Sequence, residues 1–231
     1  MFDISPAEWT AILLSLRVAV VATLVATPFG IALAWLLARR EFWGKSILDA
    51  AVHLPLVLPP VVTGYLLLLT FGRRGLVGAW LAEHLGIVFA FRWTGAALAC
   101  GIMSFPLLVR PIRLSIEAID RRLEQASSTL GAAPWQVFTT VTLPLALPGV
   151  LAGMVLGFAK AIGEFGATIT FVSNIPGETQ VISSAIYSLI QTPDGDAAAL
   201  RLVIVSVVIA TGALVASEWF ARRATQRLHG N

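Results

Sequence analysis

Long runs of apolar residues constrain the fold of this chain more than any other feature of its sequence. A helix rises 1.5 Å per residue, so about 20 consecutive apolar residues are needed to cross the hydrocarbon core of a bilayer. Segments that reach or approach this length occupy residues 9–37, 47–71, 93–109, 143–162 and 198–220. The sequence therefore predicts an all-α polytopic membrane protein with five transmembrane helices.

Two weaker apolar stretches, 76–91 and 178–191, are short for a span and contain polar residues. We expect them to form short interfacial or re-entrant helices. The orientation follows from the lysines and arginines, which concentrate in cytoplasmic loops. Three lie in 39–45, four in 110–140 and three after residue 220, whereas the loops on the opposite side hold three. This count predicts that the N-terminus lies outside the cell and the C-terminus inside.

The composition excludes several classes of function. Hydrophobic residues make up 57% of the chain and charged residues 13%, against roughly a quarter charged in soluble domains. The whole chain, 1–231, is therefore expected to form one transmembrane domain. Its net charge of +3 comes from basic residues at helix ends, which mark topology, so we expect no nucleic-acid partner. With one cysteine, Cys100, and three scattered histidines, we expect neither a redox pair nor a metal site.

One long segment between two strongly apolar regions, 124–144, is amphipathic. Gly131 divides it, because glycine is common just past the end of a helix, and Pro134 suits the first turn of the next helix. We expect a helix-turn-helix elbow in which Gly131 adopts a positive φ. Trp135 and Phe138 follow a run of small residues and complete a compact surface that a partner protein can bind.

The spacing within this elbow resembles the coupling loop of ABC importer permeases. That loop has the pattern Glu-Ala-Ala, three residues, Gly, nine residues and Ile-x-Leu-Pro. With Gly131 at the glycine of the pattern, the matching positions hold Gln125, Ala126, Ser127, Val141, Leu143 and Pro144. Gln125 stands where the family prefers glutamate and Glu124 is its neighbour, so the residue that fills the glutamate role stays open between them. The resemblance implies a cytoplasmic coupling loop at about 121–142, with ATPase-coupling residues at Glu124, Gln125, Ala126, Gly131, Trp135, Leu143 and Pro144.

Two further segments extend the likeness along the chain. The stretches HLPLVLPPVVTGYLLL (53–68) and GEFGATITFVSNIPGETQ (163–180) resemble the permease subunits of molybdate ABC importers more than those of sulfate importers. The resemblance implies a type I ABC importer permease fold, a single permease domain in the bacterial inner membrane. It also implies a homodimer, a cytoplasmic ATPase dimer that binds ATP and Mg²⁺, and an external, periplasmic binding protein that delivers the oxyanion.

Several alternatives stay open at this point. Sulfate, thiosulfate and tungstate are rival substrates, because tetrahedral dianions differ little in charge. A passive anion channel is a further alternative, distinguished by the absence of a co-purifying ATPase. The tripeptide at 44–46, Gly-Lys-Ser, resembles the end of a phosphate-binding loop, but Arg39 stands where that pattern needs a glycine. We therefore expect no ATPase site, no enzyme activity and no cofactor in this chain itself.

Two backbone features mark candidate pathway helices. Pro59 and Pro60 interrupt helical hydrogen bonding in the second predicted span, which a membrane tolerates only where protein or a water-lined cavity supplies partners. In the fourth span, Gly149, Gly153 and Gly157 recur every fourth residue. Such a stripe lets another helix approach closely or borders a narrow pore. Helix packing and pore lining are both compatible with this pattern.

A pair of ionisable residues lies near the outer end of the fourth predicted span. Charged side chains within spans are costly and usually functional. Lys160 and Glu164 stand one helical turn apart, where they either pair with each other or flank an outer gate. Gly163 and Gly166 lie on both sides of Glu164 and permit local opening of the helix.

Overall fold

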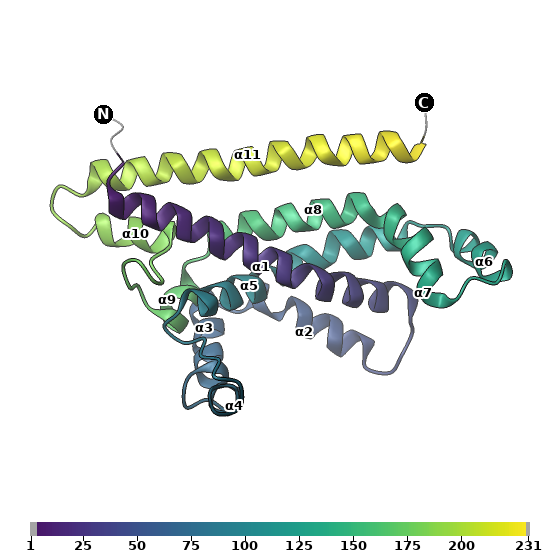
Figure 1. Ribbon diagram of the computed structural model, residues 1–231, viewed down its shortest axis with the longest axis horizontal. Coiled ribbons are helices and arrows are strands. Elements are labelled where there is room, and N and C mark those ends of the chain that lie inside the picture. The colour runs from purple at the N-terminus through teal and green to yellow at the C-terminus, as the bar shows by residue number, and fades with distance from the viewer. Residues whose placement is uncertain (1–3, 230–231) are drawn as a thin grey trace.

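Four long helices lie side by side and form the body of the protein (Figure 1). The computed structural model describes the backbone of residues 4–229 and the side chains of residues 4–216. Within these residues the chain is helical, without strands. The four long helices are α1 (Pro6–Arg39), α5 (Trp93–Glu117), α8 (Leu143–Ile162) and α11 (Asp196–His229). Their buried interfaces hold mainly alanine, valine, leucine and isoleucine, so the bundle is packed by apolar contacts.

The start of α1 is fixed by a reciprocal cap. Ser5 Oγ accepts a hydrogen bond from the Glu8 backbone N–H, and Glu8 Oε2 accepts one from the Ser5 N–H at 2.6 Å. Pro6 occupies the first helical turn, where a missing N–H costs nothing. Glu8 also pairs with Arg201 near the start of α11, at 3.0 Å. The cap therefore joins α1 to α11 at the end of the bundle where α1 begins.

The second predicted span, 47–71, is not one continuous helix. It consists of α2 (Lys45–Val57) and α3 (Pro60–Phe71), whose axes differ by 115°. Pro59 and Pro60 cause the break, because neither can donate a backbone hydrogen bond to the preceding turn. Figure 1 shows α3 and the next helix, α4 (Leu76–Leu85), projecting sideways from the bundle. The described chain thus has four helices long and apolar enough to span a membrane, or five if the bent pair is one span.

Three short helices lie outside the body formed by the long helices. The predicted short helices in 76–91 and 178–191 are confirmed as α4 and α10 (Ile182–Leu189). A further helix, α9 (Gly166–Val172), was not predicted. It packs tightly on α3, since a Cβ built on Gly64 would lie 2.5 Å from the Ala167 carbonyl oxygen. The third predicted span also continues beyond 109, because α5 carries on to Glu117.

Candidate coupling loop and transport pathway

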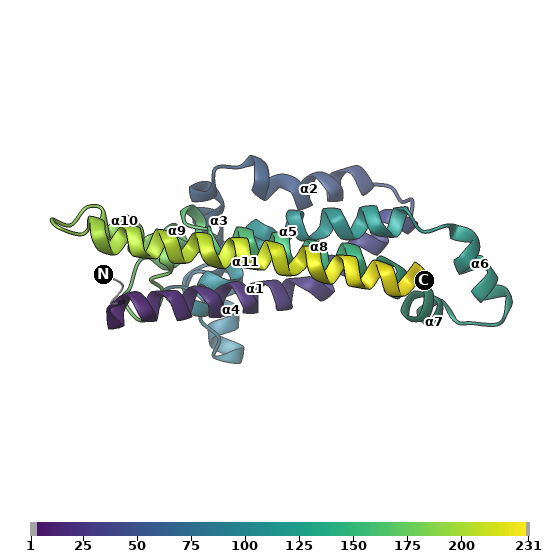
Figure 2. The same cartoon turned by 90° about the horizontal axis from the view of Figure 1, so that it is seen from above.

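The predicted elbow is confirmed as two short helices joined by a turn. They are α6 (Arg121–Thr129) and α7 (Pro134–Val137). Figure 2 shows α6 beyond the ends of the long helices and α7 level with the end of α11. Gly131 lies in the turn at φ +91°, as predicted, and Pro134 is in the first turn of α7. Asp120 caps α6 by accepting the Arg122 N–H at 2.9 Å. These local bonds give the elbow one defined shape.

The elbow joins α8 through a π-helical turn, η1 (Phe138–Thr142). The Leu143 N–H bonds to the Phe138 carbonyl, five residues back. Pro144 follows directly and has no N–H for the Thr140 carbonyl, so the α-helical pattern is interrupted at this position. Single π turns often occur at functional sites. The sequence pattern did not reveal this turn, although Pro144 was its available signal.

The residues of the coupling pattern divide into an outward and an inward group. Gln125, Ala126, Gly131 and Trp135 are exposed, and 67% of Trp135 is accessible. Leu130, which the motif does not include, is 89% exposed. Exposed apolar side chains gathered on one small elbow are typical of a protein interaction site. Leu143 and Pro144 are half-buried at the start of α8, so they belong to the joint between the elbow and the bundle.

Glu124 faces the bundle while its neighbour Gln125 faces outward. The Glu124 carboxylate pairs with Arg39, the last residue of α1, with Arg39 Nε 3.0 Å from Glu124 Oε2. The Thr142 hydroxyl donates to Glu124 Oε1 at 2.6 Å, and Arg39 donates a second bond to the Ile119 carbonyl at 3.3 Å. Sequence reasoning missed this cluster, because 85 positions separate Arg39 from Glu124.

The glycine stripe of α8 packs against α5. All three glycines are buried. A Cβ on Gly153 would lie 2.5 Å from the Leu108 carbonyl oxygen, and one on Gly149 would lie 2.3 Å from the Ser115 Cβ. Gly157 has ordinary contact distance to Leu108. Helix packing within one chain therefore accounts for the glycine stripe. That these glycines line a transport pathway stays a prediction. Pro59 and Pro60, by contrast, are exposed at the bend between α2 and α3.

Lys160 and Glu164 form an ion pair at the break between α8 and α9. The Lys160 Nζ lies 2.5 Å from Glu164 Oε2, and the Glu164 side chain is 1% exposed. Glu164 Oε1 also accepts the Ala167 N–H in the first turn of α9 at 3.0 Å. The predicted pairing of Lys160 with Glu164 is confirmed, and their role beside an outer gate stays a prediction.

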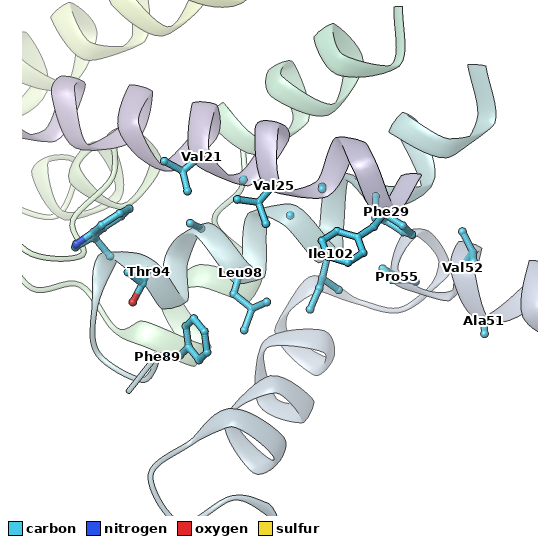
Figure 3. A pocket seen from close by; sticks show the side chains of 16 residues that line it. Val21, Val25, Phe29, Ala51, Val52, Pro55, Phe89, Thr94, Leu98 and Ile102 are labelled. Atoms are coloured by element: carbon cyan, nitrogen blue, oxygen red, sulfur yellow. The ribbon is translucent and has the colours of Figure 1, made fainter. Parts of the chain in front are cut away.

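An apolar cavity of about 650 Å³ opens between α1, α2 and α5 (Figure 3). Among the 16 residues that line it, none is charged. Val25, Leu98 and Ile102 point into it, and the Thr94 hydroxyl lies near one end. An oxyanion removed from water needs hydrogen-bond donors or positive charge. Among the lining side chains only Trp93 and Thr94 carry a hydrogen-bond donor, so this cavity is poorly suited to an oxyanion.

Most of the chain matches a known protein family. Residues 26–226 match the family described as binding-protein-dependent transport system inner membrane component. The chain belongs to this family. It is therefore a multi-pass inner membrane component of a transport system, as the sequence predicted.

Relatives within this family carry names that state their substrates. The molybdenum transport system permease protein ModB of Escherichia coli (strain K12) is 60% identical over 220 residues, which cover 95% of this chain and 96% of the relative. ModB of Haemophilus influenzae is 55% identical over 221 residues, covering 96% of each chain. The sulfate transport system permease protein CysT of E. coli (strain K12) is 37% identical over 211 residues, covering 91% of this chain and 75% of that protein.

Solved structures with the same fold are also transport proteins of this kind. A bacterial alginate ABC transporter, crystallised with its alginate-bound periplasmic protein, matches with a TM-score of 0.76 and 20% identity, covering 97% of this chain and 82% of that chain. The MetNI methionine ABC transporter matches with a TM-score of 0.65 and 14% identity, covering 94% and 93%. At these identities the likeness concerns the fold, which is that of type I ABC importer permeases.

Proposed function

We propose that this chain is the permease subunit of an ATP-driven importer of molybdate. The observation that carries the proposal is its 60% identity to a molybdenum permease over nearly the whole of both chains. A sulfate permease is more distant, at 37%. An exposed elbow stands at one end of the bundle, where a partner protein can bind it. This geometry supports a transport subunit that receives its energy from such a partner.

The elbow is the proposed docking surface for a cytoplasmic ATPase. Ala126, Leu130 and Trp135 are exposed there, and Gly131 fixes the turn between them. In this proposal the ATPase binds ATP and Mg²⁺, while the permease contributes no nucleotide site of its own. Closure of the ATPase dimer displaces the elbow, and the π turn η1 passes that displacement to α8.

A second copy of the chain is the proposed partner within the membrane. In one chain α3 and α4 project from the bundle, and apolar side chains of α3 such as Val61, Tyr65 and Leu69 are exposed. A homodimer gives these faces a protein neighbour and encloses a pathway between two bundles. The external binding protein would then dock at the end where α1 begins, opposite the elbow, with the N-terminus outside and the C-terminus, beyond the described residues, inside.

A competition assay tests the substrate. Cells that depend on this permease take up labelled molybdate, and each unlabelled oxyanion is added in tenfold excess. We expect tungstate to compete and sulfate and thiosulfate to leave uptake unchanged. Equal competition by sulfate would assign the chain to a sulfate or mixed oxyanion importer. Uptake that persists in cells depleted of ATP would instead indicate a passive channel.

Paired tryptophan variants test the docking surface. Trp135→Ala removes an exposed aromatic from the elbow, and aromatic residues are common at energetic centres of interfaces. Trp43→Ala removes one that is 96% exposed in the loop between α1 and α2, which makes it a matched control. We expect the ATPase to co-purify with the Trp43 variant and to be lost from the Trp135 variant.

A further inference from the structure

The inner end of α1 holds the coupling loop by contacts between residues far apart in the sequence. Arg39 ends α1, and its guanidinium bonds both to Glu124 on α6 and to the Ile119 carbonyl between α5 and α6. Glu124 in turn accepts the hydroxyl of Thr142, the last residue of η1. One ion pair therefore connects α1, the loop and the start of α8.

An aromatic contact lies one helical turn earlier on α1. The rings of Trp35 and Phe138 meet edge to face, with centroids 6.1 Å apart. Phe138 is the first residue of η1, and Thr142 is the last. Both ends of the π turn are thus held by α1, one by an apolar contact directly and the other through Glu124.

The ion pair is shielded from water. The Arg39 side chain is 9% exposed and that of Glu124 is 18% exposed. A nearby ion pair, Lys45 with Glu41, differs in sequence separation and in exposure. Its residues are four positions apart, and the Glu41 side chain is 87% exposed. The hydrogen bond that Lys45 donates holds the pKa of Glu41 below its ordinary value. This pair does not connect two helices. Removing one partner of a shielded pair leaves the other charge without compensation, so the two side chains are held close together.

We propose that Arg39 and Glu124 form a positioning pair that makes α1 move together with the coupling loop. The inference rests on the proposed function, since it assigns the route by which the loop's displacement reaches the bundle. Chain connectivity links the loop to α8 and to α5, whereas α1 is linked to it only through space. Without the pair, the Trp35–Phe138 contact and the packing of α1 on α5 and α8 remain, but the charged link between α1 and α6 is lost. Less of the loop's displacement then reaches α1, and fewer molybdate ions are imported per ATP hydrolysed.

The test uses the full-length chain with its ATPase and binding protein in liposomes. The measured quantity is labelled molybdate imported per ATP hydrolysed. Glu124→Gln keeps an oxygen for Thr142 but removes the charge that pairs with Arg39. We expect the ratio to fall about tenfold, as expected when one charge-assisted hydrogen bond is lost. The control, Glu41→Gln, removes a carboxylate from the exposed pair near the same end of α1 and should leave the ratio unchanged.

The double variant Arg39→Gln with Glu124→Gln tests whether the two residues act as a pair or independently. Because both variants remove the same interaction, we expect the double variant to be no worse than the poorer single one. Additive losses would overturn the pairing. Loss of the bound ATPase in Glu124→Gln would also overturn it, because Glu124 would then be a docking contact and not a positioning residue.

A distance measurement tests the pair even if the wild-type complex does not transport. Spin labels are attached at cysteines replacing Arg40, next to the end of α1, and Arg122, which is exposed on α6. The native Cys100 is 1% exposed and does not compete for the label. Labelled chains are diluted among unlabelled ones, so that distances within one chain dominate the measurement. We expect one narrow distance in the otherwise wild-type chain and a broad distribution after Glu124→Gln. Equally narrow distributions would overturn the inference, whereas wild-type liposomes without ATP-driven uptake would contradict only the proposed function.

Discussion

Replacing Gly131 with valine should disable coupling without unfolding the protein. Gly131 has φ +91°, and a Cβ built there meets no atom within 4 Å. A clash of the Cβ therefore contributes nothing to the cost, which we assign to the backbone conformation. Holding a non-glycine residue in this region costs of order 1 to 3 kcal/mol, and β-branched residues tolerate it least.

This cost is too small to unfold the protein but large enough to weaken binding of a partner at the docking surface. If the turn relaxes to avoid the strain, the exposed groups on α6 and α7 lose their relative placement. A free energy of about 1 to 3 kcal/mol changes a binding equilibrium about fivefold to over a hundredfold. Gly131→Asn is the matched control, because asparagine adopts positive φ at lower cost.

The assay measures molybdate uptake and ATPase co-purification in the same membranes, with inserted protein quantified. We expect the valine variant to be inserted at normal level but to lose uptake, ATPase binding or both. The asparagine variant should retain most of each. Normal uptake and binding in the Gly131→Val protein would refute the assignment of this turn to coupling.

Three further predictions concern the bundle and its orientation. Lys160→Ala leaves the buried Glu164 carboxylate without its cation and should lower uptake about tenfold while assembly persists; unchanged uptake would restrict Lys160 to a packing role. Gly153→Leu should reduce the amount of folded protein, since a Cβ there meets a carbonyl oxygen of α5 at 2.5 Å; normal folding would show that the helices separate freely. A reporter after Asn231 should be cytoplasmic and one near Gly177 external, and finding both on one side would contradict the topology.

Local patterns were sufficient to predict much of this fold. Hydropathy located the long helices, because crossing a membrane requires a continuous apolar run. Gly131 and Pro134 located the turn of the elbow, because glycine permits a positive φ and proline fixes φ at about −65°. Pro59 and Pro60 marked the interruption of the second span, but its 115° bend depends on packing that a local pattern does not contain.

The contacts that organise the candidate site were not predictable in this way. Glu124 and Gln125 are adjacent and both polar, and only the packed structure separates the inward carboxylate from the outward amide. From the sequence, Arg39 entered only the topology count and the exclusion of a phosphate-binding loop. Its pairing with Glu124 arises from helix packing across 85 positions, which no local pattern encodes.

We propose that this chain imports molybdate with energy delivered by a separate ATPase. The most direct measurement places the purified chain in liposomes with its ATPase and binding protein, and records entry of labelled molybdate with and without ATP. We expect accumulation only when ATP and both partners are present, and none when a hydrolysis-deficient ATPase is substituted. Molybdate entry that is equally fast without ATP, or no entry with all components present, would contradict it.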